Sequence, residues 1–123
     1  MKILLLIGTG SFIGGVSRYL LSQWIQPKSL NAFPWGTLSV NLIGCLLIGI
    51  IFGLAEKGNL SNEVRLFLTT GVLGGFTTFS AFSNETVIML HNGQSTNAFV
   101  YILISVLVGI TAPVLGILAT RMF

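Results

Sequence analysis

Charged side chains are scarce in this sequence of 123 residues, of which 7% are charged and 53% are apolar. Soluble domains carry about a quarter charged residues, so a surface this poor in charge must face lipid rather than water. Aspartate is absent, and histidine and cysteine occur once each, as His91 and Cys45. Such a set cannot ligate the metal of a hydrolase and argues against a nucleophile–histidine–acid triad, so we expect no enzyme.

Basic residues do not cluster either, which argues against a nucleic-acid partner. The formal net charge is only +3, a balance that is compatible with the handling of an anion. Cys45 lies in the apolar run "LIGCLLIG" and has no second cysteine with which to form a disulfide. We therefore interpret Cys45 as a small buried apolar residue.

What the sequence does contain is four apolar segments, each close to the roughly 20 residues that a membrane-crossing helix needs. They cover about residues 3–24, 35–55, 65–90 and 97–120, and the connections between them are short. Trp35 is expected to anchor the second segment at the interface, and Pro113 lies inside the fourth, where it predicts a kink. The sequence predicts an all-α membrane protein, with a single integral membrane domain over residues 1–123.

The basic residues of the loops and ends give only a weak prediction of orientation. Four spans place both ends and the second loop on one side, with four basic residues, against two on the other side: Lys2, Lys57, Arg65 and Arg121 against Arg18 and Lys28. On charge alone the ends belong in the cytoplasm, although so small a bias is compatible with insertion in both orientations.

Glycine is abundant, with 15 residues, and several glycines are spaced for close helix packing. The small-xxx-small pattern occurs at Gly10–Gly14, Gly49–Gly53 and Gly71–Gly75. Four helices make a thin bundle with little interior, so we expect an oligomer.

Polar side chains inside a span are costly in lipid and therefore require a reason. Asn41 lies deep in the second span, where it would either form an interhelical hydrogen bond or donate an N–H to a passing ion, and both alternatives stay open. Arg18 would reach the interface or make an entrance electropositive. Ser105 lies one turn after Tyr101 on the same helix face, where it would either bond back to the Tyr101 carbonyl or act together with the tyrosine hydroxyl.

The third span contains the stretch "GGFTTFSAFSNE" at residues 74–85, which combines two glycines with hydroxyl, amide and carboxyl groups and three phenylalanines. We expect Gly74 and Gly75 to break the helix and to free carbonyl groups there. Beyond the break, hydroxyl and amide side chains fall on one face and Phe79 and Phe82 on the other. Ring edges carry partial positive charge and can contact an anion without binding it tightly, which suits conduction. The residues thus predict a small-anion pathway, without identifying the anion.

In these motifs the sequence resembles the Fluc (CrcB-like) fluoride channels. The resemblance is carried by "GGVSRY" at 14–19, "PWGTLSVNLIG" at 34–44 and, most specifically, "GGFTTFSAFSNE" at 74–85. It implies four transmembrane helices with a broken third helix, assembled as an antiparallel, dual-topology homodimer with two pores. It also implies passive export of cytoplasmic fluoride, fluoride resistance and a place in the inner or plasma membrane of a bacterium.

The resemblance assigns roles to particular residues. It implies pore-lining roles for Asn41, Phe79, Phe82, Tyr101 and Ser105, and makes Arg18 a vestibule residue and Glu85 a near-pore carboxylate. The carbonyls of Gly74 and Thr77 would hold a structural Na⁺ at the dimer centre. A second helix-four hydroxyl of the family is replaced here by Gly109, so the polar track is either shorter or completed by another residue, Thr78 or Ser80.

Two other classes remain as alternatives. A small multidrug-type, proton-coupled transporter also has four short helices, but it needs a carboxylate on the first helix, where this sequence has Arg18 and no acid. A structural or assembly subunit would use the polar stripe of the third span as an interface only.

Overall fold

The computed structural model describes residues 1–123 as an all-helical chain with four long apolar spans. Three spans are single helices: α1 (Lys2–Ile25), α2 (Trp35–Glu56) and α6 (Ser95–Thr120). The remaining span, Asn62–His91, is divided into several pieces. Each span is long and apolar enough to cross a membrane, so the chain is a multi-pass membrane protein.

The divided third span changes helix type and then breaks. Its four pieces, in chain order, are α3 (Asn62–Leu66), η1 (Phe67–Leu73), α4 (Gly74–Phe76) and α5 (Phe79–His91). The span begins at an N-cap serine, since Ser61 Oγ accepts a hydrogen bond from the Val64 N–H at 3.3 Å. The η1 segment is a π-helix, a rare form that often marks functional regions of helices.

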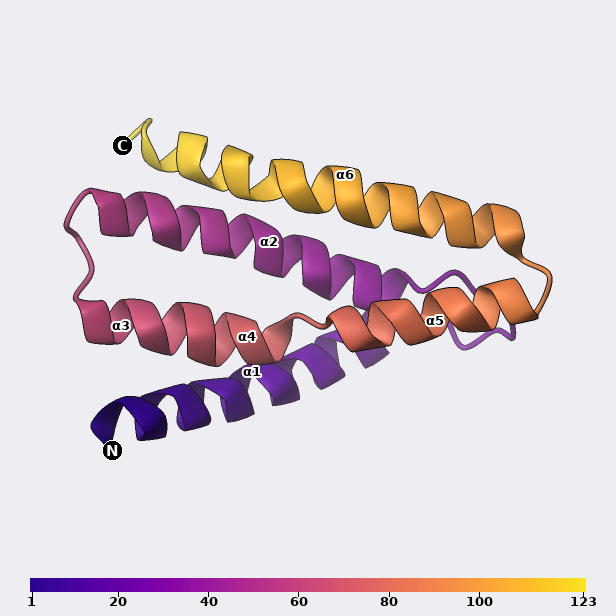
Figure 1. Ribbon diagram of the computed structural model, residues 1–123, viewed down its shortest axis with the longest axis horizontal. Coiled ribbons are helices and arrows are strands. Elements are labelled where there is room, and N and C mark those ends of the chain that lie inside the picture. The colour runs from indigo at the N-terminus through magenta and orange to yellow at the C-terminus, as the bar shows by residue number, and fades with distance from the viewer.

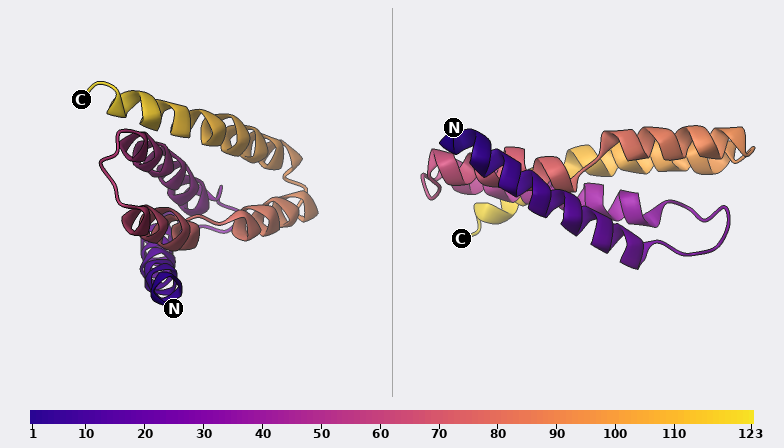
Figure 2. Two further views of the ribbon diagram at one scale, coloured as in Figure 1. Left: turned by 60° about the vertical axis from the view of Figure 1, so that its left-hand side comes forward. Right: turned by 90° about the horizontal axis from the view of Figure 1, so that it is seen from below.

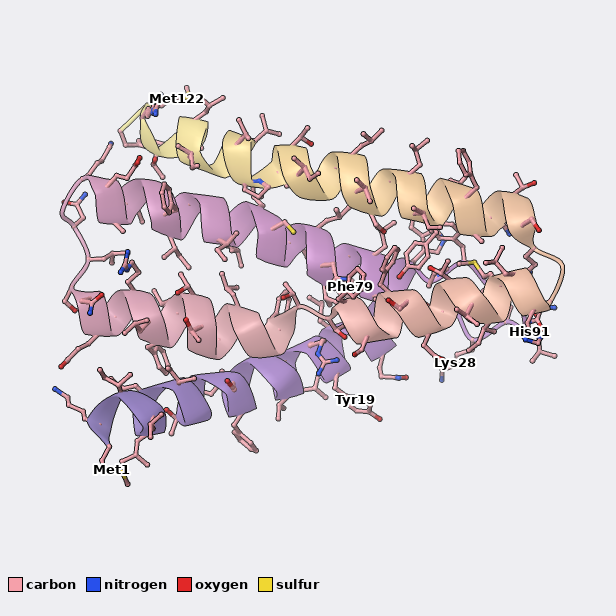
Figure 3. All side chains as sticks on the ribbon, viewed as in Figure 1. Met1, Tyr19, Lys28, Phe79, His91 and Met122 are labelled. Carbon is pink, nitrogen blue, oxygen red and sulfur yellow. The ribbon has the colours of Figure 1, made fainter.

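The spans run back and forth, so that both ends of the chain and the α2–α3 loop lie at one end of the bundle (Figure 1). Met1 and Met122 mark this end in Figure 3, and Lys28 and His91 mark the opposite end. Glycines with a positive φ of 74°, Gly58 and Gly93, follow the last residues of α2 and α5 and allow the chain to leave each helix.

Glycines of all three predicted small-xxx-small pairs lie at close contacts between helices. A Cβ at Gly10 would lie 2.9 Å from Gly71 Cα, and one at Gly14 would overlap the Val72 carbonyl oxygen, so α1 presses directly on the third span. A Cβ at Gly49 would overlap the carbonyl of Pro113 in α6. The predicted close packing is confirmed.

The bundle is thin, and most of its apolar surface is exposed. Two small clusters of buried side chains form the core: Leu38, Met89, Ala98 and Tyr101 in one, and Val40, Leu73 and Phe76 in the other. Long apolar side chains elsewhere, such as Phe12 and Trp24 on α1, are exposed, as expected for helices that face lipid. Figure 2 shows α1 crossing the first half of the third span, while α5 and α6 converge at the loop that joins them.

The predicted spans agree with the observed ones to within three residues, but the predicted site of the break is wrong. Gly74 and Gly75 are helical, in α4, and the break lies at Thr77 and Thr78, between α4 and α5. Gly75 serves close packing instead, because a Cβ there would overlap the Ser11 carbonyl oxygen. Nothing in the sequence signalled the π-helix of residues 67–73.

Candidate functional site

The break in the third span is two residues of extended backbone. Thr77 has φ −92° and ψ 157°, and Thr78 has φ −151° and ψ 118°. Thr78 is the N-cap of α5, and its Oγ1 accepts a hydrogen bond from the Ala81 N–H at 3.2 Å. The same hydroxyl lies 3.2 Å from Ser80 Oγ.

Asn41 of α2 holds the break from across the bundle. Its Nδ2 donates to the Thr78 carbonyl at 3.0 Å, and its Oδ1 accepts from the Thr78 N–H at 2.8 Å. The interhelical hydrogen bond that was one of the two alternatives for Asn41 is therefore present. An amide NH₂ carries two hydrogens, so one remains for another acceptor.

Arg18 of α1 also contacts the break. Its Nε donates to the Gly75 carbonyl at 3.0 Å, so this side chain bonds to the third span instead of only reaching toward the interface. Together, Asn41 and Arg18 supply hydrogen-bond partners to backbone groups that the interrupted helix can no longer satisfy.

A cavity of about 360 Å³ lies beside the break, between α2, the third span and α6. Its lining includes five of the seven predicted pore residues: Asn41, Thr78, Phe79, Phe82 and Ser105. Gly109 and Cys45 also line it, so Cys45 faces a cavity and is not sealed in the core. Ser80, Tyr101, Arg18 and Glu85 lie outside its lining.

Phe79 and Phe82, one helical turn apart, both line this cavity. The ring centroids of Phe79 and Phe82 are 5.5 Å apart, with the planes inclined by 49°. Phe79 is 78% exposed and lies beside the break in the centre of Figure 3, whereas Phe82 packs on Tyr101 with the centroids 5.0 Å apart. One ring is thus held by the bundle and the other is open to its surroundings.

Ser105 differs from two other hydroxyl residues of α6, Thr111 and Thr120. Thr111 and Thr120 donate to carbonyls of their own helix, but Ser105 does not, so the first of its two alternatives, a bond to the Tyr101 carbonyl, is not the one observed. The Ser105 hydroxyl lines the cavity. It is therefore available to a ligand there.

Tyr101 and Thr37, both buried, form a separate group with the half-buried Glu85. The Tyr101 hydroxyl donates to Glu85 Oε2 at 2.7 Å, and Thr37 Oγ1 donates to Oε1 at 2.6 Å. Tyr101 is fully buried, so its predicted place in the pore lining is not visible in the single chain. A second cavity, of about 430 Å³, reaches Thr37 and Glu85 from the loop end of the bundle.

Thr37 was missed by the sequence reasoning. The available signal was its spacing from Asn41, four residues further along α2, because residues at i and i+4 share a helix face. That face of α2 therefore carries both polar contacts to the third span: Thr37 to Glu85 and Asn41 to Thr78.

Backbone carbonyls are the candidate metal ligands in this chain. No group of three or more His, Cys, Asp or Glu side chains could hold a metal ion. In a continuous α-helix, the N–H groups of Thr78 and Ala81 would bond to the carbonyls of Gly74 and Thr77. Both N–H groups donate to side-chain oxygens instead, so these two carbonyls lose their helical partners and fit a hard cation that prefers oxygen ligands.

Comparison with known proteins agrees with the resemblance inferred from the motifs. The family described as "CrcB-like protein, Camphor Resistance (CrcB)" matches residues 5–117. A protein of Phocaeicola vulgatus named "Fluoride-specific ion channel FluC" is 48% identical over 95% of this chain and 97% of its own length. Proteins with the same name from Rhizobium meliloti and Flavobacterium psychrophilum are each 43% identical over 98% of both chains.

These relatives are named as ion channels, so neither an enzyme nor the alternative of a proton-coupled transporter receives support. The match covers most or all of each of the four spans and includes the break in the third. The chain belongs to the CrcB-like family.

Proposed function

We propose that this protein is a fluoride-selective channel that lets fluoride leave the cytoplasm passively. The observation that carries the proposal is the cavity beside the break, where amide, hydroxyl and aromatic groups converge inside a membrane-spanning bundle. The identity of the ion rests on the relatives, which are named fluoride-specific ion channels.

The cavity offers weak donors and no side chain of formal charge. Asn41 has one N–H that Thr78 does not use, Ser105 has a free hydroxyl, and Phe79 and Phe82 can turn ring edges toward an anion. These groups can replace part of the water shell of a small anion. The absence of a cationic side chain keeps the anion from being trapped, as conduction requires.

The driving force for export is electrical. An inside-negative membrane potential contributes about 2.3 kcal/mol per elementary charge for each 100 mV. Fluoride that enters as neutral HF dissociates in a more alkaline cytoplasm and is trapped there as the anion. A selective pathway then lets the potential expel it without a coupled energy source.

We further propose an antiparallel homodimer with two pores, each completed by the partner chain. A single copy leaves Phe79 exposed beside the cavity, although the family resemblance places this ring in a pore. The bundle also has little interior of its own, with 20 of 123 residues buried. The small difference in basic residues between its two ends supports insertion in both orientations.

A structural Na⁺ at the centre of this dimer is part of the proposal. The carbonyls of Gly74 and Thr77 would hold it in each copy, since both lack their helical N–H partners. Bound there, the cation would tie the two broken spans together. Its role is assembly, and no step of conduction is assigned to it.

The function is tested by reconstituting the purified protein in liposomes loaded with either fluoride or chloride. Efflux is followed with an ion-selective electrode after a potassium ionophore is added. The ionophore lets K⁺ leave as the counter-ion, so that no opposing membrane potential builds up. We expect rapid loss of fluoride and retention of chloride. Equal loss of both ions would refute selectivity, proton-coupled movement of a cation would support a transporter, and no flux would support a structural subunit.

The topology is tested separately with a cysteine placed in a tag after Phe123, in a Cys45→Ala background. Impermeant thiol reagents should label this tag from both sides of the membrane. Labelling of every molecule from one side alone would refute the antiparallel dimer without affecting the flux result.

A further inference from the structure

Two hydrogen bonds at the break run from backbone N–H groups to side-chain oxygens. The Thr78 N–H donates to Asn41 Oδ1 at 2.8 Å, and the Ala81 N–H donates to Thr78 Oγ1 at 3.2 Å. In an unbroken α-helix these N–H groups would bond to the carbonyls four residues earlier, which are those of Gly74 and Thr77. The two side chains therefore remove the helical partners of the same two carbonyls that are proposed to hold the cation.

Two neighbouring carbonyls at the break, in contrast, accept hydrogen bonds from side chains. The Gly75 carbonyl receives the Arg18 Nε–H at 3.0 Å, and the Thr78 carbonyl receives the Asn41 Nδ2–H at 3.0 Å. A carbonyl that already accepts a hydrogen bond from a fixed donor is a poorer ligand for a cation, because one of its lone pairs is in use. Side chains at the break therefore satisfy the Gly75 and Thr78 carbonyls and leave the Gly74 and Thr77 carbonyls without their helical hydrogen-bond donors.

Helix α2 fixes both residues of the break at once. Asn41 holds Thr78, and three residues later Gly44 leaves room for Thr77, whose Cγ2 occupies the place that a Cβ of Gly44 would need. Residues three apart on a helix share a face, so one face of α2 contacts both residues of the extended segment. This contact depends on a glycine and an amide and involves no charged side chain.

We infer that Asn41 and Thr78 are positioning residues for the cation: by capturing two N–H groups they keep the Gly74 and Thr77 carbonyls free to ligate it. An unpartnered carbonyl inside a membrane is costly, and a bound cation removes that cost. The inference rests on the proposed Na⁺ site. The inference explains why these two carbonyls of the third span are available to ligate a cation.

The experiment measures Na⁺ binding through thermal unfolding, without any measurement of flux. Purified protein in detergent is unfolded at increasing Na⁺, with N-methyl-D-glucamine chloride holding the ionic strength constant, and the Na⁺ concentration at half of the stabilisation is recorded. The informative variant is Thr78→Val, which keeps the shape of the side chain but removes the hydroxyl that captures the Ala81 N–H. Thr78→Ser keeps the hydroxyl and is its matched control.

We expect Thr78→Val to raise the half-stabilising Na⁺ concentration about tenfold, as the loss of an N-cap hydrogen bond would. Thr78→Ser should stay within about twofold of the wild type, because serine is an equally good N-cap. Thr69→Val is a second control, since Thr69 also lines the cavity and its hydroxyl bonds only to the Arg65 carbonyl, four residues earlier in the third span. It should leave the Na⁺ dependence unchanged.

A second pair of variants tests Asn41 in the same assay. Asn41→Leu removes the group that captures the Thr78 N–H and should abolish the Na⁺ dependence, whereas Asn41→Asp keeps an acceptor oxygen in place and should retain part of it. If Asn41→Leu does not fold, the Thr78 pair decides.

The possible results distinguish a failure of this inference from a failure of the proposed cation site on which it rests. A wild type that Na⁺ stabilises no more than N-methyl-D-glucamine does would overturn both the cation site and this inference, and would leave the fluoride channel to the liposome assay. A wild type that responds to Na⁺ while Thr78→Val keeps the same midpoint would overturn the inference alone.

Discussion

The two halves of the third span are built in different ways. The first half, from α3 to α4, packs on α1 through glycines, so that Gly10, Gly14 and Gly75 bring main chain against main chain. The second half, α5, is held by side chains: Phe82 packs on Tyr101, and Glu85 accepts hydrogen bonds from α2 and α6. The close-packed first half therefore fixes the position of the break. The second half, α5, supplies the aromatic and polar side chains that contact α2 and α6.

The largest effect is expected in the glycine half. In Gly14→Ala the new Cβ would overlap the Val72 carbonyl oxygen, and the backbone cannot move without separating α1 from the third span. We expect a loss of about 3 kcal/mol or failure to fold, measured by thermal unfolding in detergent. Gly15→Ala is the matched control, because open space surrounds that position. Equal melting of the two variants would mean that the close approach contributes nothing.

The next effect should appear in flux, with the fold retained. Asn41→Asp exchanges an amide for a carboxylate of nearly the same shape, and two like charges about 4 Å apart repel by about 4 kcal/mol at an effective dielectric near 20. A barrier raised by that amount slows fluoride by roughly three orders of magnitude.

Efflux through Asn41→Asp is measured at neutral and at alkaline pH, so that the aspartate is charged in at least one condition. Asn84→Asp adds the same group at an exposed position of α5 and should change flux little. Near-normal flux through Asn41→Asp at alkaline pH would remove Asn41 from the pathway and leave it only the bond to Thr78.

A smaller loss of stability is expected in the half that side chains hold together. Tyr101→Phe removes one of the two hydroxyls that donate hydrogen bonds to Glu85. It leaves a partly buried carboxylate oxygen without its partner. The cost should be about 1–3 kcal/mol by thermal unfolding, and Thr37→Val should cost a similar amount through the other oxygen. Tyr19→Phe, at a tyrosine that is 65% exposed, serves as the control. If Tyr101→Phe melts like Tyr19→Phe, the Glu85 group does not stabilise α5.

The smallest effect is expected at Gly109, which lines the cavity where a hydroxyl was expected from the family resemblance. Gly109→Ser fits without strain, because the nearest atom to a new Cβ would be Cys45 Sγ at 4.0 Å. One more donor should tighten fluoride binding by about two- to fivefold, seen as a lower half-saturating concentration in efflux, with the melting temperature unchanged. An unchanged half-saturation would place Gly109 outside the ion's path.

Much of this fold is readable from the sequence because membrane helices obey strong local rules. Length and hydropathy predict the four spans, and glycine spacing predicts which faces meet. The position of the break is different: a glycine pair suggested residues 74 and 75, yet the helix opens at Thr77 and Thr78. The partner that stabilises the opening there is Asn41, on another helix, and no local pattern reveals that contact.

The candidate site shows the same limit. The motif singled out Phe79, Phe82 and Thr78, and Asn41 was apparent as a lone amide in an apolar helix, and all four line one cavity. Thr37 was missed, since its spacing from Asn41 was the only local signal and its role depends on Glu85, which accepts hydrogen bonds from both Thr37 and Tyr101.

The central claim is that the cavity beside the break is the path for fluoride, and the most direct test is flux through Phe82→Ile, since Phe82 lines that cavity. Isoleucine keeps apolar bulk but has no electropositive ring edge, so fluoride efflux from liposomes should fall by about tenfold or more. Phe12→Ile, at a ring that is 73% exposed on α1, should conduct like the wild type. Wild-type flux through a folded Phe82→Ile protein would contradict the claim and reduce the ring to packing.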